Sequence, residues 1–469
     1  MTAQRLLIRF VLDPLGRLMS RFSPQVKDRG FLLGGLGLYL IFFISASGHA
    51  PSRYFFLFAP GCLCMGVMIL CALPEKLRPL PVDRLLSVCW FGAGLFMLFA
   101  GLRYNTDNLS DAIMFLAAWP VTWLAFNQRD ISHIFYLLSK LCILSFLLFL
   151  AVSLLFFPIT DKQYSGLIEN VNNTAMYLSL VFCCLLVELF QSRKFSLRML
   201  WNLVLIGVVM TMTFYTNSRT GQLAILSALL FSSVLYLLNN RKNLAKRVLL
   251  NILPVILSFF LFLPTTVYIF QGVGAVSRIV SETVSGLLTD EKAETPPSEV
   301  TETPPSGPHG IQGFLEVNER KTSTEGKTLD SVSTGRLSIW KEFAKHIRPF
   351  GTDGEVRYYV EARGYDYTTA HNTPLEYAIY SGLFCGVLYF LFNILAGLKS
   401  IWYALRQSEK PYSLLPFAVT IAFGVCSMLG SLKTPFIYMI SMYYFFVQAP
   451  LMIPSAQTPP ADSLPAVKE

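Results

Sequence analysis

Long apolar runs follow one another along almost the whole chain, and short polar connections separate them. We place twelve such runs, each close to the ~20 residues that an α-helix needs to cross a bilayer. They are 31–47, 54–73, 82–101, 111–126, 134–157, 172–190, 199–216, 221–238, 249–271, 374–398, 411–431 and 434–453. The pattern predicts an all-α polytopic membrane protein with about twelve transmembrane helices.

Composition supports this prediction. Hydrophobic residues make up 53% and charged residues 14% of 469 residues, which is more apolar surface than a soluble domain can bury. The first thirty residues, 1–30, are basic and lack the compact apolar core of a cleavable signal peptide. Their leucines alternate with arginines, so we expect a helix lying on the inner leaflet.

The distribution of lysine and arginine predicts the orientation. Segment 1–30 and every second connection after it are rich in cations. The opposite short connections carry few: Arg53, Arg103, Lys162, Arg219 and Lys433. Because cytoplasmic loops carry the excess of positive charge, both termini, including a tail at 454–469, are expected in the cytoplasm. The net charge of +9 follows from this bias and calls for no nucleic-acid partner.

One long polar loop, 272–373, interrupts the apolar pattern between the first nine spans (31–271) and the last three (374–453). Its first half repeats Glu-Thr-Pro-Pro-Ser, and we interpret 290–310 as a disordered Pro-rich spacer. Its second half, 333–372, regains apolar residues and is expected to be the ordered, catalytic part. By the charge pattern, this loop lies on the outer, periplasmic face.

Arg336 begins a predicted amphipathic helix over 336–347, where Trp340, Phe343 and Ile347 recur at helical spacing. A helix N-terminus with an arginine in its first turn is a good site for a diphosphate. The alternative is that Arg336 stacks on Trp340 or pairs with a nearby carboxylate.

His371 precedes Thr373-Pro-Leu-Glu376, which has the form of a capping box and predicts where the tenth span begins. The imidazole is therefore expected at the outer membrane surface, where it can act as a general base near neutral pH. A structural histidine that bonds the loop is the alternative.

Arg219 lies in the turn Thr216-Asn-Ser-Arg-Thr-Gly221 between the seventh and eighth spans, with Asn217 or Ser218 as the expected helix cap. The alternative is an interfacial arginine that only extends toward water. However, the predicted topology puts Arg219, Arg336 and His371 at one depth on one side, which favours a shared site.

The sequence contains no residue pattern that indicates a metal or cofactor site. All nine cysteines fall in apolar runs, and the loop contains neither Asp-x-Asp nor a cluster of metal-ligand residues. We therefore expect no metal and no cofactor. Ionisable residues are also few inside the spans, which argues against an ion-coupled transporter.

The ordered series Ser218-Arg-Thr-Gly221, Gly335-Arg-x-x-x-Trp340, Pro349-x-Gly-x-x-Gly354 and His371-Asn-x-x-Leu375 resembles the O-antigen ligase and O-antigen polymerase superfamily. The resemblance implies a GT-C-like membrane fold. It also implies a metal-independent, inverting glycosyltransferase of the inner membrane with a periplasmic site.

For a ligase, the resemblance implies an O-antigen donor on undecaprenyl diphosphate and an acceptor sugar of the lipid A core, used in lipopolysaccharide biosynthesis among membrane lipids. Carried over by motif, Arg219 and Arg336 hold the diphosphate and His371 serves the acceptor. We also assign Trp340, Asn372 and Arg363 to binding of the diphosphate or the acceptor.

Three other functions remain open at this point. An O-antigen polymerase uses the same donor with a lipid-linked acceptor, and a protein O-oligosaccharyltransferase transfers to protein. A lipid-linked oligosaccharide flippase belongs to another class, and it predicts internal repeats and a charged central cavity that the sequence does not display.

Overall fold

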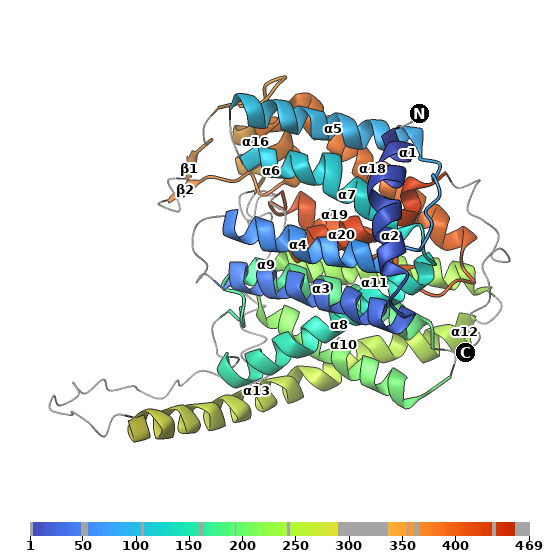
Figure 1. Cartoon of the computed structure of the whole chain (residues 1–469). Helices are drawn as coiled ribbons and strands as arrows, with labels where there is room; N and C mark the ends of the chain where they lie inside the picture. The colour runs from blue at the N-terminus through green and yellow to red at the C-terminus, as the bar shows by residue number, and fades with distance from the viewer. Residues whose placement is uncertain are drawn as a thin grey trace.

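The computed structural model describes residues 3–47, 55–104, 107–157, 159, 163–192, 194–241, 244–288, 336–353, 356–360, 365–433 and 438–454. Within these ranges the chain is a bundle of roughly parallel and antiparallel helices (Figure 1). The predicted spacer 290–310, the start of the ordered loop at 333, Arg363 and the tail 455–469 lie outside the described residues.

The helices that form the bundle match the predicted apolar runs. They are α3 (Pro24–Ala46), α4 (Phe55–Ala72), α5 (Arg84–Arg103), α6 (Asp107–Ile113) continued by α7 (Trp119–Phe126), α8 (Ile131–Phe156), α9 (Val171–Phe190), α10 (Leu197–Tyr215), α11 (Arg219–Asn239), α12 (Leu244–Arg247) continued by α13 (Leu253–Leu288), α18 (Leu383–Arg406), α19 (Leu415–Met428) and α20 (Met439–Val447).

Nine helices of the described chain are long and apolar enough to cross a membrane. The helices at Leu57–Ala72 and Leu415–Met428 are apolar but shorter, and α20 is shorter still. The prediction of an all-α polytopic membrane protein is confirmed.

Side-chain caps fix where many of these helices begin. Asp83, Asp130, Asn170, Ser196 and Ser218 each accept a hydrogen bond from a backbone N–H in the first turn that follows. Helix α9 lies at the centre of the bundle, and 94% of its 18-residue apolar segment is buried. Its neighbours include α8, α10, α11 and α19.

The two ends of the bundle carry different short elements (Figure 1). One end, here called the α16 end, carries the short helix α16 (Arg336–Ala344) and the antiparallel hairpin β1 (Tyr358–Val360) and β2 (Tyr365–Tyr367). The other, the α12 end, carries α12 and the N-terminal helices α1 (Ala3–Leu7) and α2 (Asp13–Met19). The N-terminal helices pack on the connection before α5, where the Asp13 carboxylate accepts a hydrogen bond from the Leu77 N–H at 3.1 Å.

The structure differs from the sequence prediction at two boundaries. Helix α13 continues to Leu288, so the segment that follows the ninth span begins as helix and not as loop from residue 272. The predicted tenth span is two helices, α17 (Thr373–Tyr380) and α18, because the chain turns at Gly382 with φ +99°. That left-handed conformation favours glycine and ends one helix before the next begins.

Candidate functional site

Arg219 is the first residue of α11, and the turn before it is tightly held. The Ser218 hydroxyl caps α11 by accepting from the Gly221 N–H at 3.4 Å, and it donates to the Asn172 side chain of α9 at 2.8 Å. Ser218 is thus the cap, one of the two residues expected from the sequence. The residue before it, Asn217, takes a left-handed conformation with φ +57°.

The structure explains why the last residue of the Ser-Arg-Thr-Gly motif, Gly221, is a glycine. A Cβ atom there would lie 2.4 Å from Ala175 Cβ on α9, which is too close for any side chain. The glycine therefore lets α11 approach α9, and this contact fixes where Arg219 stands at the α16 end.

Arg336 is the first residue of α16, which ends at Ala344, three residues before the predicted boundary. Its guanidinium donates to the Thr220 hydroxyl at 3.2 Å, and Thr220 follows Arg219 in the chain. Burial lowers the pKa of Arg336, the positive charge of Arg219 lowers it further, and Tyr367 acts in the opposite direction. Two arginines from distant segments therefore meet at one place.

A small apolar cluster holds α16 in this position. Ile339 and Phe343 pack with Val356, Ile379 and Tyr380, which belong to the hairpin region and α17. Trp340, one turn after Arg336, is partly exposed, but its indole N–H is shielded from water and meets no hydrogen-bond acceptor among the described residues.

Tyr367 connects the arginines to His371. Its ring stands nearly perpendicular to the His371 imidazole, with 84° between the planes and 5.9 Å between the ring centroids. The same tyrosine is an electrostatic neighbour of Arg336. Arg219, Arg336 and His371, predicted from the sequence to share a site, are thus linked through Thr220 and Tyr367 at the α16 end.

His371 has a strained backbone, with φ +50°. This conformation costs a residue with a side chain about 1–2 kcal/mol, so neighbouring contacts must hold it. Its Nε2 atom lies 3.5 Å from the Thr369 hydroxyl. The imidazole is partly exposed.

Asn372, and not Thr373, caps α17, which corrects the expected capping box by one residue. The Asn372 side chain accepts from the Leu375 N–H at 3.0 Å and donates to the Met428 carbonyl at 3.3 Å. Thr373 is the first helical residue, and its hydroxyl donates to the Gly430 carbonyl and accepts from the Leu432 N–H, both at 3.0 Å. The Asn372 amide is engaged at both ends by the fold, and its contact with substrate stays a prediction.

Gly351 of the Pro-x-Gly motif and Gly382 also permit close contacts. A Cβ at Gly351 would lie 2.5 Å from the Tyr380 carbonyl oxygen, and one at Gly382 would lie 2.4 Å from the Pro349 carbonyl oxygen. The Leu383 N–H donates to the Arg348 carbonyl at 2.8 Å. The Pro-x-Gly motif therefore packs into the break between α17 and α18.

Sequence reasoning did not assign three residues that the structure brings to this site. The only sequence feature that could have pointed to Tyr367 is a short run of alternating aromatic residues around it. Glu376 has Lys433 as an electrostatic neighbour, and Lys433 Nζ lies 4.1 Å from the Tyr380 ring centroid. Arg363 cannot be placed, because it lies outside the described residues.

No cluster of three or more histidine, cysteine, aspartate or glutamate side chains suited to a metal ion occurs in the described ranges. Metal independence therefore stays a prediction about the chemistry. Tyr367, the two arginines and His371 offer donors for an anion and a proton acceptor at one surface.

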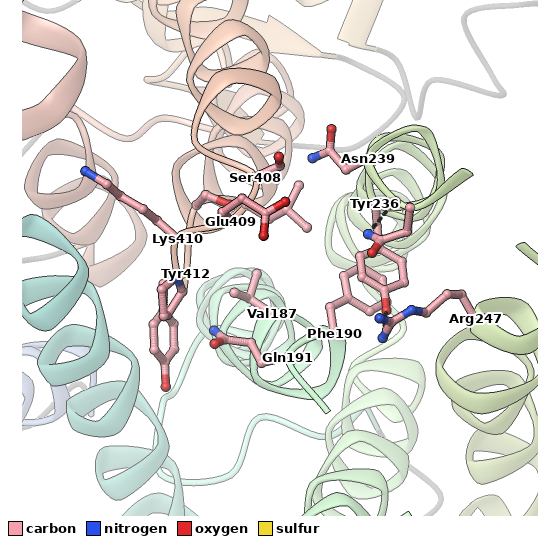
Figure 2. A pocket seen from close by; sticks show the side chains of 14 residues that line it. Val187, Phe190, Gln191, Tyr236, Asn239, Arg247, Ser408, Glu409, Lys410 and Tyr412 are labelled. Carbon is pink, nitrogen blue, oxygen red and sulfur yellow. Dashed lines mark hydrogen bonds between the residues drawn. The ribbon is translucent and has the colours of Figure 1, made fainter. Parts of the chain in front are cut away.

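A polar cavity of about 180 Å³ lies at the other end of the bundle. Figure 2 shows its walls: Tyr236, Asn239 and Arg247 on one side, the segment from Ser408 to Tyr412 on the other, and Val187, Phe190 and Gln191 between them. Arg219 and Asn239 are the two ends of α11, so cavity and site are separated by roughly 30 Å of helix. The cavity is not part of the candidate site.

The family model for O-antigen ligases matches residues 208–390, a segment that contains Arg219, Arg336, Tyr367 and His371. The resemblance to the O-antigen ligase and polymerase superfamily is thereby confirmed. The match indicates O-antigen ligase or polymerase type activity within a glycosyltransferase-like family. A comparison with curated proteins finds no match.

Proposed function

We propose that this protein is an O-antigen ligase, which transfers O-antigen polysaccharide from undecaprenyl diphosphate to a sugar hydroxyl of the lipid A core. The family match supports the donor type, and the twelve-run layout with its long loop before the tenth run favours the ligase over the polymerase. The observation that carries the proposal is the meeting of Arg219, Arg336 and His371 at the α16 end.

Arg219 and Arg336 would bind the diphosphate of the donor. Each begins a helix, so backbone N–H groups and a guanidinium point to the same region. Burial and the like charge of Arg219 both lower the pKa of Arg336. A diphosphate between the two guanidinium groups would offset both effects.

His371 would act as the base toward the acceptor. In the proposed step the acceptor hydroxyl attacks the anomeric carbon, its proton passes to the imidazole, and a new C–O bond forms. The old bond from the anomeric carbon to the phosphate oxygen breaks, and its electron pair leaves with undecaprenyl diphosphate. The arginines stabilise the charge that develops on that oxygen, and a single direct attack inverts the anomeric configuration.

Trp340 and Arg363 complete the proposed binding set. The shielded indole N–H of Trp340 lies one turn from Arg336, where it can donate to a phosphate or sugar oxygen. We place this end of the bundle on the periplasmic side of the inner membrane, because the connections at the opposite end carry most of the cations. The GT-C-like relationship and the use of no metal belong to the same proposal.

The test is transfer by the purified protein in lipid, with a labelled undecaprenyl-diphosphate-linked O-antigen donor. With lipid A core present, the label should move to the core; with donor alone, no longer lipid-linked chain should form. Elongation of the lipid-linked donor in the absence of core would identify a polymerase instead. Labelled peptide or protein as the product would identify a protein glycosyltransferase.

A further inference from the structure

The polar cavity at the α12 end lies between the ends of transmembrane helices. Its walls come from the last turns of α9 and α11, from α12, and from the connection between α18 and α19 (Figure 2). Its volume of about 180 Å³ is smaller than the ~300–1,000 Å³ of pockets for drug-sized ligands. The cavity therefore suits a small polar group.

One wall of the cavity presents a cation held by an aromatic pair. The Arg247 guanidinium donates to the Tyr236 hydroxyl at 3.0 Å, and the Asn251 side chain donates to the same oxygen at 2.7 Å. The Tyr236 ring stacks on Phe190, with 4.3 Å between the centroids and 10° between the planes. Within the described part of the chain, Arg247 forms no ion pair with a carboxylate. Its charge is fixed at the wall and is not balanced there.

The facing wall presents a carboxylate. Figure 2 shows the Glu409 carboxylate directed into the cavity, while the Lys410 side chain extends away from Arg247. Tyr412 holds this connection in place, because its hydroxyl donates to the buried Glu188 carboxylate of α9 at 2.5 Å. Among the described residues, Glu409 has no cation within ion-pair distance. The cavity thus has opposite charges on two walls that do not meet.

A ligand with an anion at one end and a cation at the other would bind both walls at once. Phosphate is an anion that a guanidinium binds through two parallel hydrogen bonds. The Glu409 carboxylate only accepts hydrogen bonds, and an ammonium group offers three donors to it. Gln191 Nε2, which also lines the cavity, is buried and meets no acceptor in the described ranges, so it supplies a further donor.

Apolar surface beside the cavity indicates that such a ligand carries a lipid tail. The Asn239 side chain joins α11 to α18 by donating to the Ala404 carbonyl at 3.1 Å. Leu238 and Leu405, their neighbours in the chain, are 45% and 39% exposed. Acyl chains attached to a group in the cavity would cover these leucines. Polar pockets between transmembrane helices are typical places for phospholipid head groups.

We propose that the cavity at the α12 end binds the head group of a phospholipid that carries a phosphate and a primary ammonium, with the phosphate at Arg247 and the ammonium at Glu409. The site is separate from the transfer reaction, because the length of α11 lies between them. In the orientation inferred from the cation pattern, the lipid belongs to the cytoplasmic leaflet. The bound head group would join α12 to the connection between α18 and α19.

The experiment titrates the purified full-length protein in detergent with phosphatidylethanolamine and, separately, with phosphatidylglycerol of the same acyl chains. Native mass spectrometry measures the bound lipid. Arg247→Gln should weaken the binding of both lipids about 10–100-fold, because both lose the charged partner of their phosphate. Glu409→Gln should weaken only the ethanolamine lipid, by about 10-fold, and Glu409→Lys should strengthen the glycerol lipid.

Glu409 is an exposed residue of a connection, so its two variants carry the test if Arg247→Gln fails to fold. Arg241→Gln and Glu75→Gln remove exposed charges at the same end that do not line the cavity, and these controls should change nothing. Wild-type lipid binding by the cavity variants, or equal changes for both lipids in the Glu409 variants, overturns the proposal. Displacement of the lipid by an equal concentration of free phosphoethanolamine overturns the lipid as the source of the head group.

Discussion

Three cations at the α12 end and Arg336 at the α16 end contact different kinds of group. At the α12 end, Arg198 meets Glu188 at 2.6 Å, Arg129 meets Asp28 at 2.7 Å, and Lys399 pairs with Asp83. At the α16 end, the Arg336 guanidinium donates to a neutral hydroxyl and stands beside a second arginine. The paired charges join helices to one another, whereas neighbouring like charges oppose folding. In the proposed function, the donor diphosphate would offset this repulsion.

The largest expected effect at the α16 end comes from removing the base. His371→Ala should lower the turnover of transfer about 10²–10⁴-fold, because a general base typically contributes that much, while donor binding persists. Single-turnover rates and donor binding measure the two quantities independently. His346→Ala, an exposed histidine after the end of α16, is the matched control. Loss of donor binding at unchanged turnover would contradict the assignment.

Arg336 tests the comparison directly, because its role in activity and its effect on stability should have opposite signs. Arg336→Gln should lower turnover about 10²–10³-fold through loss of charge stabilisation, and Arg336→Lys should also lose most activity because it cannot bind a phosphate bidentately. The melting temperature of Arg336→Gln should stay the same or rise, since a buried like charge is removed. A melting temperature that falls would show that Arg336 is a structural residue.

Arg198 is the counterpart at the α12 end. Arg198→Ala leaves the buried Glu188 carboxylate with the hydrogen bond from the Tyr412 hydroxyl, so the free energy of unfolding should fall by about 1–2 kcal/mol. Turnover per folded molecule should remain within about 2-fold, because the site is a bilayer thickness away. Thermal unfolding in detergent and transfer assays on the same preparation make the measurement. A large loss of turnover would contradict the comparison, because Arg198 would then serve transfer as well as stability.

The smallest expected effect is that of a chelator. In the proposed mechanism, arginines take the place of the cation that metal-dependent glycosyltransferases use, so excess chelator should leave the transfer rate unchanged. An enzyme that loses activity and regains it with magnesium or manganese would contradict the proposed metal-free chemistry. Transfer should be followed before and after chelation, with each metal added back separately.

The spans were predictable from the sequence because each apolar run of bilayer length has one stable solution, a helix. Their charge pattern also put Arg219, Arg336 and His371 at one end, and the structure links these three. The break between α17 and α18 was not predictable. It depends on Pro349 and Gly351 packing against Gly382, a contact between segments distant in the chain.

The residue that caps α17 was likewise not predictable from the local sequence. Both Asn372 and Thr373 have side chains that can cap a helix, and the local pattern favoured Thr373 with Glu376. In the structure the Thr373 hydroxyl bonds Gly430 and Leu432, and Glu376 turns toward Ser431. Contacts with segment 428–433 therefore determine which residue caps α17. The sequence around residue 372 does not indicate these contacts.

The turn at Gly382 decides how far the site stands from the bilayer. Were α17 to continue α18 in a straight line, the ten residues from Thr373 to Gly382 would carry His371 about 15 Å beyond the helix end. Instead α17 folds back on α18, where a Cβ at Gly386 would lie 2.5 Å from Ala378 Cβ. A polyisoprenoid carrier could then react while its tail stays dissolved in lipid, avoiding an extraction cost of about 0.8 kcal/mol per CH₂ group. Donor and enzyme would meet by lateral diffusion in a plane.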